Sequence, residues 1–558
     1  MSRIIGIDLG TSTTEAAVFV DGKPQMIRNF DNEIVTPSAV GVDENGSWVA
    51  GARAAAQYLL MPEKTAIEIK RKIGTEERFS IGKRSYSAVE LSAKLLEYVR
   101  DYASEELGED ITRAVISVPA YFNDTQRKET IYAARLCGLD VERIINEPTA
   151  AALSYGLEHL EEESHILVYD LGGGTFDVTL LEMFDGVLDV KASAGDNQLG
   201  GKDFDERLIE ELLQRFEKKN GVSPRNNRRA MSRIRREAEK CKITLSAKTE
   251  CRILLAALMD GKNGPLAMEE VVTRAEFEEL TKDLIARTHH PIDVVLKDAR
   301  LSAAELDRII LVGGSTRMPA VRADLAAYLK KEPEAAVDPD FAVAQGAAIQ
   351  AALLEGQLDS EAGDLMITDV NPYTLGVRCS DGYDDHNIMS VIIPRNVTIP
   401  VSRTNRYWTM HPGQTQIKVE IYQGESSRAS ENHFLGQYML EGIPYNPIAT
   451  EEVEITFTYD VNGILETQAK CVSNGEAASM RIDMMKDIPD LENWKDSQLA
   501  ENYRALIRRA ERRMKKETGE KADDLAILVK DLKYAILNED KDEAEDAAAK
   551  LATALENE

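Results

Sequence analysis

The spacing of apolar residues along this chain changes twice and predicts three kinds of structure in succession. Over residues 1–356, apolar runs such as VISVPAYF (115–122) alternate with segments of helical spacing, which is an α/β pattern. Over 371–487, apolar and polar residues alternate, as is typical of antiparallel strands with one buried face. From 488 to 558 the spacing is helical again. Residues 357–370 form a linker whose apolar end suggests that it docks.

Two segments of the α/β region repeat one phrase. Residues 4–19 read IIGIDLGTSTTEAAVF, and residues 166–181 read ILVYDLGGGTFDVTLL. Each is a strand, an Asp-Leu-Gly, a tight turn and a returning strand. The turns leave backbone N–H groups free to bind an anion, while Asp8 and Asp170 can hold a hydrated Mg²⁺ beside it. The repeat therefore predicts a duplicated domain that grips a nucleotide polyphosphate between its halves.

Further acidic residues fit phosphoryl transfer, which needs charge neutralisation and a positioned water. Asp177 follows Asp170 on the returning strand, and Glu147 precedes Pro148 at an expected helix start. A helix-capping role is the alternative for Glu147. The predicted phosphate-binding turn residues are Thr11, Ser12 and Thr13 on one side and Gly172, Gly173 and Gly174 on the other.

Composition narrows the class of protein. The chain has 558 residues and a net charge of −29, which argues against nucleic-acid binding as its main activity. One basic stretch (225–242) is interpreted as a solvated helix face rather than a nucleic-acid patch. We find no signal-peptide pattern and no apolar run long enough to span a membrane. The five cysteines lack metal-ligand spacing, so a reduced, cytoplasmic protein without membrane contact is expected.

An ordered set of motifs carries a resemblance to a known family. The set includes IGIDLGT, KRKIG, VPAYFNDTQR, INEPTAAALSYG, YDLGGGTFD, GDNQLGGKDFD and VGGSTRMP, followed by NPYTLGV, PRNVTIP, IYQGE and YDVNGIL. The chain resembles the 70-kilodalton heat-shock chaperones of the DnaK type, and it is most similar to the short, specialised HscC-type bacterial branch. The resemblance implies an actin-like ATPase domain, an antiparallel β-sandwich that binds peptides and a short helical C-terminal lid.

The resemblance also implies roles for individual residues. Lys70 matches the lysine that reaches the γ-phosphate, although a surface lysine is the alternative from sequence alone. Glu147 and Asp177 would orient the attacking water, and Asp8, Asp170 and Thr175 would position metal and γ-phosphate. The residues implied to bind the rest of the nucleotide are Gly201, Glu239, Lys242, Ser246, Gly313, Gly314, Ser315, Arg317 and Asp340. The residues implied to transmit nucleotide state or bind a J-domain co-chaperone are Pro119, Arg127, Arg143, Asn146 and Asp369, each with a local structural role as the alternative.

In the β region the resemblance implies a peptide-binding pocket. The matching positions are Ser380, Tyr407, Met410, Ile417, Val419 and Ile464. For the Ile and Val residues among them, the alternative interpretation is that they form the core of the sandwich. Ser380 and Met410 depart from the residues usual on the two sides of the arch over the peptide. The segment between Lys70 and VPAYF is also short, and few residues follow the β region. These departures predict faster peptide release and a narrower set of clients than a general chaperone has.

The leading hypothesis is an ATPase with slow turnover that uses ATP and Mg²⁺, and K⁺ as well, to bind and release extended apolar polypeptides. The expected partners are unfolded clients and a J-domain co-chaperone, with a nucleotide exchange factor left open, and the chain is expected to be a monomer. The alternative is a nucleotide-dependent regulator dedicated to one protein partner. A sugar kinase or actin-like filament would share the duplicated ATPase fold but would not explain residues 371–487.

Overall fold

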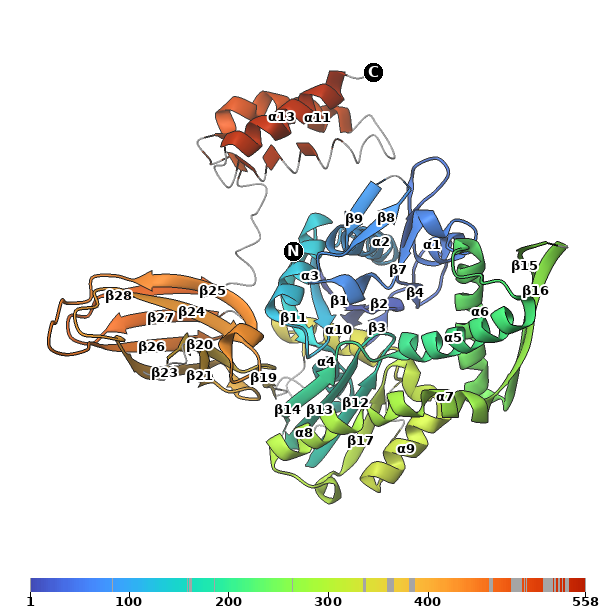
Figure 1. Ribbon diagram of the computed structural model, residues 1–558, viewed down its shortest axis with the longest axis horizontal. Coiled ribbons are helices and arrows are strands. Elements are labelled where there is room, and N and C mark those ends of the chain that lie inside the picture. Colours follow the sequence, from blue (N-terminus) through green and yellow to red (C-terminus); the bar gives the residue numbers. More distant parts are fainter. Residues whose placement is uncertain are drawn as a thin grey trace.

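The computed structural model contains two α/β lobes, a β-rich region and a group of C-terminal helices (Figure 1). The residues that it describes are 2–82, 84–157, 159, 163–184, 186–262, 264–334, 338–358, 366–380, 387–460, 465–482, 494–495, 497, 499–514, 525, 528–529, 532–533, 535–536 and 541–556. No described helix is both long enough and apolar enough to cross a membrane.

The first lobe is built on a six-stranded sheet that carries the first copy of the repeated phrase. Its order is β11-β10-β1-β2-β3, and β4 pairs with β2. β1 runs parallel to β10 and antiparallel to β2, which returns the chain after the turn at residues 10–12. The strands are β1 (Ile4–Leu9), β2 (Thr13–Val20), β3 (Lys23–Met26), β4 (Thr36–Pro37), β10 (Arg113–Val118) and β11 (Asp140–Asn146). The expected strand at 115–122 therefore ends before Pro119.

The second lobe repeats this plan with the second copy of the phrase. Its five-stranded sheet has the order β17-β12-β13-β14-β18, with β12 parallel to β17 and antiparallel to β13. Asp8 and Asp170 therefore lie near the ends of equivalent central strands, as expected for a duplication. The strands are β12 (Ser164–Leu171), β13 (Phe176–Phe184), β14 (Val187–Asp196), β17 (Arg308–Val312) and β18 (Met366–Ile367).

Helices and smaller sheets surround these two lobes. The helices are α1 (Gly51–Gln57), α2 (Ala88–Leu107), α3 (Asp124–Leu136), α4 (Glu147–Gly156), α5 (Gly201–Asn220), α6 (Arg228–Ala247), α7 (Arg274–Ala286), α8 (His289–Ala299), α9 (Pro319–Leu329) and α10 (Ala342–Glu355). The smaller sheets are formed by β5 (Ala39–Val42), β6 (Trp48–Ala50) and β7 (Thr65–Ile67), by β8 (Arg78–Ile81) with β9 (Arg84–Ser87), and by β15 (Glu250–Gly261) with β16 (Gly264–Thr273). Capping boxes at Ser87 and Asn123 fix the starts of α2 and α3.

Helices α4 and α10 join the lobes. One buried cluster contains residues of both large sheets and both helices, including Val115, Ala150, Val168 and Ala347. The helices approach very closely, because a Cβ atom on Gly346 would lie 1.7 Å from the carbonyl oxygen of Ala150. This contact fixes the hinge between the lobes, and only glycine fits there.

The β region consists of two four-stranded antiparallel sheets that share one hydrophobic core. β19 (Asp369–Val370) and β22 (Thr398–Ile399) pair beside them. One sheet contains β20 (Leu375–Cys379), β21 (Ile388–Ile393), β24 (Ile417–Gln423) and β25 (His433–Leu440), and the other contains β23 (Val401–Trp408), β26 (Glu452–Tyr459), β27 (Leu465–Cys471) and β28 (Ala477–Ile482). β26 and β27 pair antiparallel, and residues 461–464 between them lie outside the described residues.

The C-terminal helices α11 (Ala500–Met514) and α13 (Lys541–Glu556) lie apart from the two β-sheets in Figure 1. They share a separate core with Trp494, Leu532 and Leu551. The helical stripes expected after residue 488 thus bury their apolar faces against one another.

We predict that Gly346→Ala destabilises the protein by at least about 3 kcal/mol, because the added methyl group must displace the backbone of α4. Thermal unfolding followed by circular dichroism measures the effect. Ala327→Gly on exposed α9 is the control and should cost about 1 kcal/mol from helix propensity alone. Equal effects of the two substitutions would contradict the close packing of α4 and α10.

Candidate active site

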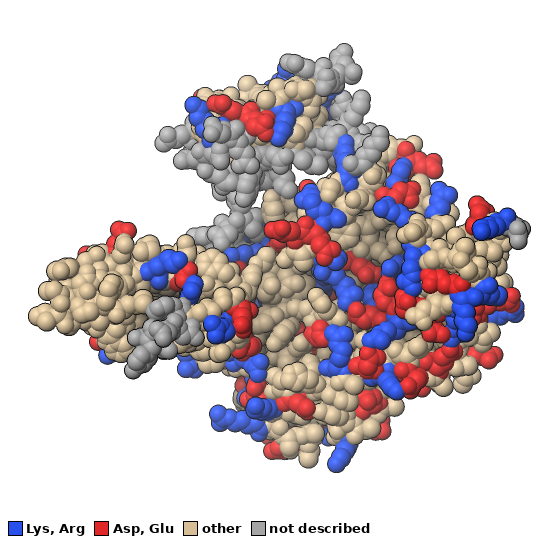
Figure 2. Space-filling model, viewed as in Figure 1, with Lys and Arg blue, Asp and Glu red and all other residues tan. Residues whose placement is uncertain are grey.

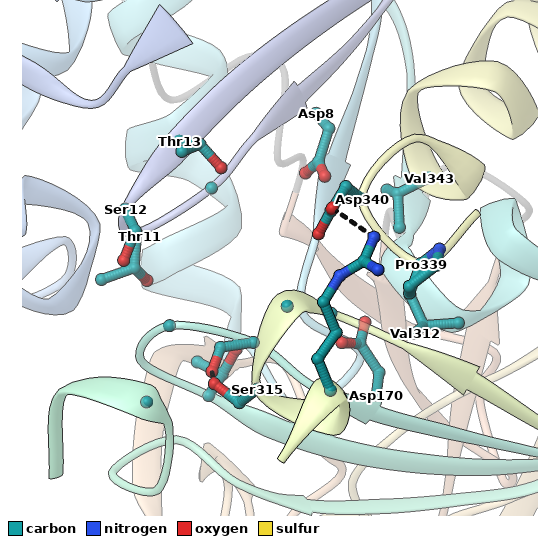
Figure 3. A pocket seen from close by; sticks show the side chains of 18 of the residues that line it. Asp8, Thr11, Ser12, Thr13, Asp170, Val312, Ser315, Pro339, Asp340 and Val343 are labelled. Carbon is teal, nitrogen blue, oxygen red and sulfur yellow. Dashed lines mark hydrogen bonds and ion pairs between the residues drawn. The ribbon is translucent and has the colours of Figure 1, made fainter. Parts of the chain in front are cut away.

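A cavity of about 440 Å³ lies between the lobes. The turn after β1 forms one wall, and the turn after β12 forms another. Figure 3 shows Thr11, Ser12 and Thr13 on one side of this space and Asp170 and Ser315 on another. The two copies of the repeated phrase therefore face each other across one site, as their symmetry predicts.

Most of the expected site residues line this cavity. They are Asp8, Thr11, Ser12, Thr13, Lys70, Glu147, Asp170, Gly172, Gly173, Thr175, Gly201, Glu239, Lys242, Ser246, Gly313, Gly314, Ser315, Arg317 and Asp340. Gly174 and Asp177 are not among the lining residues. Asp177 lies behind the wall with only 1% of its surface exposed, and its Oδ1 accepts a 3.3 Å hydrogen bond from the backbone N–H of Tyr121.

Glycine is required where the two turns meet. A Cβ atom on Gly173 would lie 2.3 Å from Oγ of Ser12 in the opposite turn. A side chain there would push the turns apart and misdirect the N–H groups that face the cavity. The glycine triplet in the second turn thus serves the close approach of the two lobes.

Lys70 is the one cation at the acidic end of the cavity among the described residues. It lies in the short 3₁₀ segment Ile69–Lys72 and makes a buried ion pair with Glu147, 77 positions along the chain. Burial alone would lower the pKa of Lys70, but the carboxylates of Glu147 and Asp8 outweigh it and raise this pKa. The ammonium group therefore stays charged.

The acidic groups around Lys70 outnumber it. Desolvation raises the pKa of Asp8 and that of Glu147, and the charge of Lys70 opposes both shifts. Desolvation, with repulsion from Glu147, Asp177 and Asp8, raises the pKa of Asp170 well above its ordinary value. Desolvation and the charge of Glu147 raise the pKa of Asp177 to about 8. The site thus holds more negative charge than its own lysine balances.

Glu15 adds to this excess, and sequence reasoning missed it. It lines the cavity from β2, directly opposite Asp8 in the strand register, and is 2% exposed. Burial and repulsion from Asp8 raise the pKa of Glu15 well above its ordinary value. A charged residue in the otherwise apolar strand at 15–19 was the available signal. Other lining residues that the sequence did not indicate are Gly10, Ile243, Val312, Met318, Pro339 and Val343.

This acidic end fits a hydrated divalent cation. Oδ2 of Asp177 is buried without a hydrogen-bond partner in the described structure, and the surrounding carboxylates repel one another. No group of three or more acidic, His or Cys side chains among the described residues is arranged to hold a metal ion directly. A cation held mainly through its water molecules, with Asp8 and Asp170 nearest, matches both observations.

Other polar groups that line the cavity are held by neighbouring residues. Nζ of Lys242 donates to the carbonyl oxygen of Gly201 and lies 2.9 Å from Oδ1 of Asp205, while Glu239 pairs with Lys202 at 2.7 Å. Arg317 pairs with Asp340 at 2.6 Å, as the dashed line in Figure 3 marks. Its half-exposed guanidinium is therefore fixed at the rim of the cavity.

The residues expected to transmit nucleotide state form one hydrogen-bonded group. Arg127 donates to the carbonyl oxygens of Phe122 and Ala120 and, at 2.7 Å, to Oδ1 of Asn146. Nδ2 of Asn146 donates to both carboxylate oxygens of Asp369, at 3.0 and 2.9 Å. Pro119 begins the turn that contains these carbonyl groups, and the charge of Arg143 acts on Asp369.

The expected peptide-binding residues differ from one another in how exposed they are. Val419 is buried in the shared core of the two sheets, which favours its alternative role as core, and Ile417 packs against the same core. The hydroxyl of Tyr407 lies 2.9 Å from that of Ser390. Met410 is 67% exposed, Ser380 is half-buried, and Ile464 lies outside the described residues.

Comparisons with known proteins agree along the whole chain. The family model described as Hsp70 protein matches residues 4–81 and 76–558. The chain is 43% identical over 528 residues to proteins named Chaperone protein DnaK from Thermotoga petrophila and Thermotoga maritima, covering 94% of this chain and 87% of each relative. A protein of the same name from Thermosipho melanesiensis is 42% identical over 527 residues, with the same coverage.

We predict that Glu15→Gln stabilises the nucleotide-free protein at pH 8 by about 1 kcal/mol. The pKa of Glu15 is higher in the folded protein than in the unfolded chain. The protein therefore loses stability as pH rises from the unfolded-state pKa of Glu15 towards its folded-state pKa. The gain should therefore vanish near pH 4. Urea unfolding at both pH values measures it, with exposed Glu105→Gln as control. An equal gain at both pH values would show that ionisation is not its cause.

Proposed function

The chain belongs to the Hsp70 family and is an ATP-dependent chaperone, and from this premise we propose how its own residues hydrolyse ATP and pass that event to a bound polypeptide. Chaperones of the DnaK kind bind unfolded polypeptide clients, and the family hydrolyses ATP with Mg²⁺. The cavity between two equivalent turns supports binding of the nucleotide phosphates there.

Lys70, Glu147 and Asp177 do the chemical work in this proposal. Lys70 keeps its proton and turns from Glu147 towards the γ-phosphate as the nucleotide enters. Glu147 is thereby free to hold the attacking water by a hydrogen bond. The pKa of Asp177, about 8 in the nucleotide-free site, lies close enough to neutral pH for this carboxyl group to gain and lose a proton. The water oxygen bonds to the γ-phosphorus, its proton passes towards these carboxylates, and the bond to the β-phosphate oxygen breaks.

The charge balance supports more than one bound cation. Five carboxylates surround Lys70, namely the half-buried Asp8 and the buried Glu15, Glu147, Asp170 and Asp177. ATP brings further negative charge to the same place. Mg²⁺ would neutralise the phosphates and polarise the γ-phosphoryl group, with Asp8 and Asp170 holding its water molecules and Thr175 beside them. K⁺ would balance the remaining charge.

The proposed coupling between the cavity and the β region rests on one observation. The expected catalytic acids lie next to residues that touch the linker and the β region. Glu147 follows Asn146, which binds Asp369 of the linker. The N–H of Tyr121 donates to Asp177, and the carbonyl oxygen of Tyr121 accepts a 2.6 Å hydrogen bond from Tyr373 of the β region. A change at the γ-phosphate therefore reaches the β region through two short paths.

At the other end, the two packed sheets serve as a β-sandwich that holds an extended apolar segment of a client. The C-terminal helices act as a short lid, and their separate core supports this assignment. Met410, exposed at the end of the strand that carries Tyr407, lies at the peptide site. A regulator dedicated to one partner remains the second candidate, favoured by the altered arch and the short helical region.

The other assignments rest on sequence similarity and composition. The chain belongs with the HscC-type branch, works in the cytoplasm as a monomer, and is served by a J-domain co-chaperone that contacts Arg143, Asn146 and Asp369.

We predict that extended apolar peptides accelerate single-turnover hydrolysis of ATP and that Lys70→Ala removes both the basal and the stimulated reaction, by about a hundredfold or more. Rapid-quench measurement of phosphate release tests this, with exposed Lys23→Ala as control. Hydrolysis that no peptide in a broad panel stimulates would favour the dedicated-regulator alternative.

We predict that Asp369→Ala reduces the stimulation by peptide at least fivefold, because it removes two hydrogen bonds to Asn146 at a buried site. Unstimulated hydrolysis should stay within about threefold of the natural chain, since the cavity is intact. Asp110→Ala, at an exposed position of the first lobe, is the control. Full stimulation in Asp369→Ala would rule out this path.

A further inference from the structure

We infer that Arg71 and Asp203 form a clasp that positions Lys70 against the second phosphate-binding turn, so that both residues are positioning residues for hydrolysis. Neither lines the cavity, and neither was indicated by the sequence. The inference rests on the proposed role of Lys70. The clasp links the two lobes and sets the position of Lys70 in the first lobe relative to the phosphate-binding turn of the second.

The clasp crosses from lobe to lobe. Nη2 of Arg71 donates to Oδ1 and Oδ2 of Asp203 at 3.0 and 2.9 Å, 132 positions apart in the sequence. Arg71 follows Lys70 in the 3₁₀ segment of the first lobe, and Asp203 lies in the first turn of α5 in the second lobe. Both side chains are largely buried, so the charge-assisted bonds are partly shielded from water.

On the second lobe the clasp is tied to the turn at Gly172–Gly174. Oδ2 of Asp203 also accepts the N–H of Gly200 at 2.8 Å. The next two N–H groups, of Gly201 and Lys202, donate to the carbonyl oxygens of Gly172 and Gly173 at 2.9 and 2.8 Å. Asp203 thus holds the segment on which the second phosphate-binding turn rests.

On the first lobe the clasp is tied to Lys70. The aliphatic stem of Arg71 lies over Gly174, where an added Cβ would meet Cγ of Arg71 at 3.1 Å. Glu68, which begins this segment, has a left-handed backbone with φ of 58°, and such a conformation persists only where surrounding contacts enforce it. Arg71 supplies one such contact. Lys70 and Arg71 then point to different partners from one rigid turn.

The position of Lys70 relative to the N–H groups of the second turn decides how the γ-phosphate is held. A misplacement of about 1 Å can slow a reaction by about a hundredfold. The ADP part of the nucleotide does not depend on this distance, because other residues bind it. Loss of the clasp should therefore slow the hydrolysis of bound ATP and leave the affinity for ADP nearly unchanged.

The test measures single-turnover hydrolysis of prebound ATP and the dissociation constant of ADP for Arg71→Ala, Asp203→Asn and the double variant of the full chain. Asparagine at 203 can still accept the N–H of Gly200, so the start of α5 is preserved. We expect each single variant to hydrolyse ATP at least tenfold more slowly, and the double variant to be no slower than the worse single one. The dissociation constant of ADP should change less than threefold.

Arg225→Ala is the matched control. Arg225 makes a similar two-bond pair with Glu210, at 2.9 and 2.8 Å, but within one lobe, and neither residue lines the cavity. Its hydrolysis rate should equal that of the natural chain. Thermal unfolding of all variants separates a loss of folding from a loss of positioning, and Arg71→Lys should recover part of the rate.

Three results would overturn the inference. Additive effects of the two substitutions would show that the residues do not act as a unit. Weaker ADP binding with normal hydrolysis of bound ATP would make the pair a latch for nucleotide release instead. If Arg71→Ala hydrolyses ATP normally while Lys70→Ala is inactive, the clasp is refuted and the proposed role of Lys70 stands. If Lys70→Ala hydrolyses ATP normally, the proposed role of Lys70 itself is refuted.

Discussion

The structure depends on an unbalanced group of charges at the meeting point of its two lobes. Lys70 stands among buried carboxylates, and desolvation raises the pKa of each acid in the group. Such a site is costly to close without added cations, because each charge lacks water and lies near others of the same sign. In the proposed mechanism, Mg²⁺ bound with a nucleotide would supply positive charge at this position. Closure of the lobes would thereby be linked to occupancy of the site, which is the first requirement of an ATP-driven machine.

The close packing of α4 and α10 would let this local event move whole lobes in the proposed mechanism. Both sheets contribute to the core around these helices, and Gly346 lets their backbones touch. Packed interfaces of this kind rotate as rigid bodies more readily than they deform. Glu147 begins α4, so the residue that pairs with Lys70 lies on the element that joins the lobes. A movement of the Lys70–Glu147 ion pair would therefore move α4, which joins the lobes.

The sequence predicted the parts of the site that local structure determines. The Asp-Leu-Gly turns, their returning strands and the helix start at Glu147 all follow from short-range rules. The alternation over 371–487 likewise indicated strands with one buried face, and Ile421 lies on such a face. The placement of Lys70 came only from resemblance to a family, because its partner is 77 positions away. The pair Arg71–Asp203 was missed for the same reason, whereas Glu15 had a local signal, a charge in an otherwise apolar strand. The surroundings of that pair exist only once strands and lobes have assembled, and no periodicity encodes that.

The linker shows why the coupling can be reversible. Met366 and Ile367 add only two residues to the edge of β14, and Met366 is 62% exposed. Val370 is buried in the core cluster that joins the lobes, and Ile367 packs against this cluster. The linker also makes polar contacts: Thr368 donates to Asp189, and Asp369 accepts from Asn146. Burial raises the pKa of Asp369, and hydrogen bonds from Val370 and Asn146 and the charges of Arg127 and Arg143 offset it only in part. A two-residue strand pairing, one buried valine and a partly compensated acid hold the docked linker, and the proposed mechanism requires the docked and released states to lie close in free energy. A small change at Asn146, next to the residue that pairs with Lys70, is then enough to shift the balance between them.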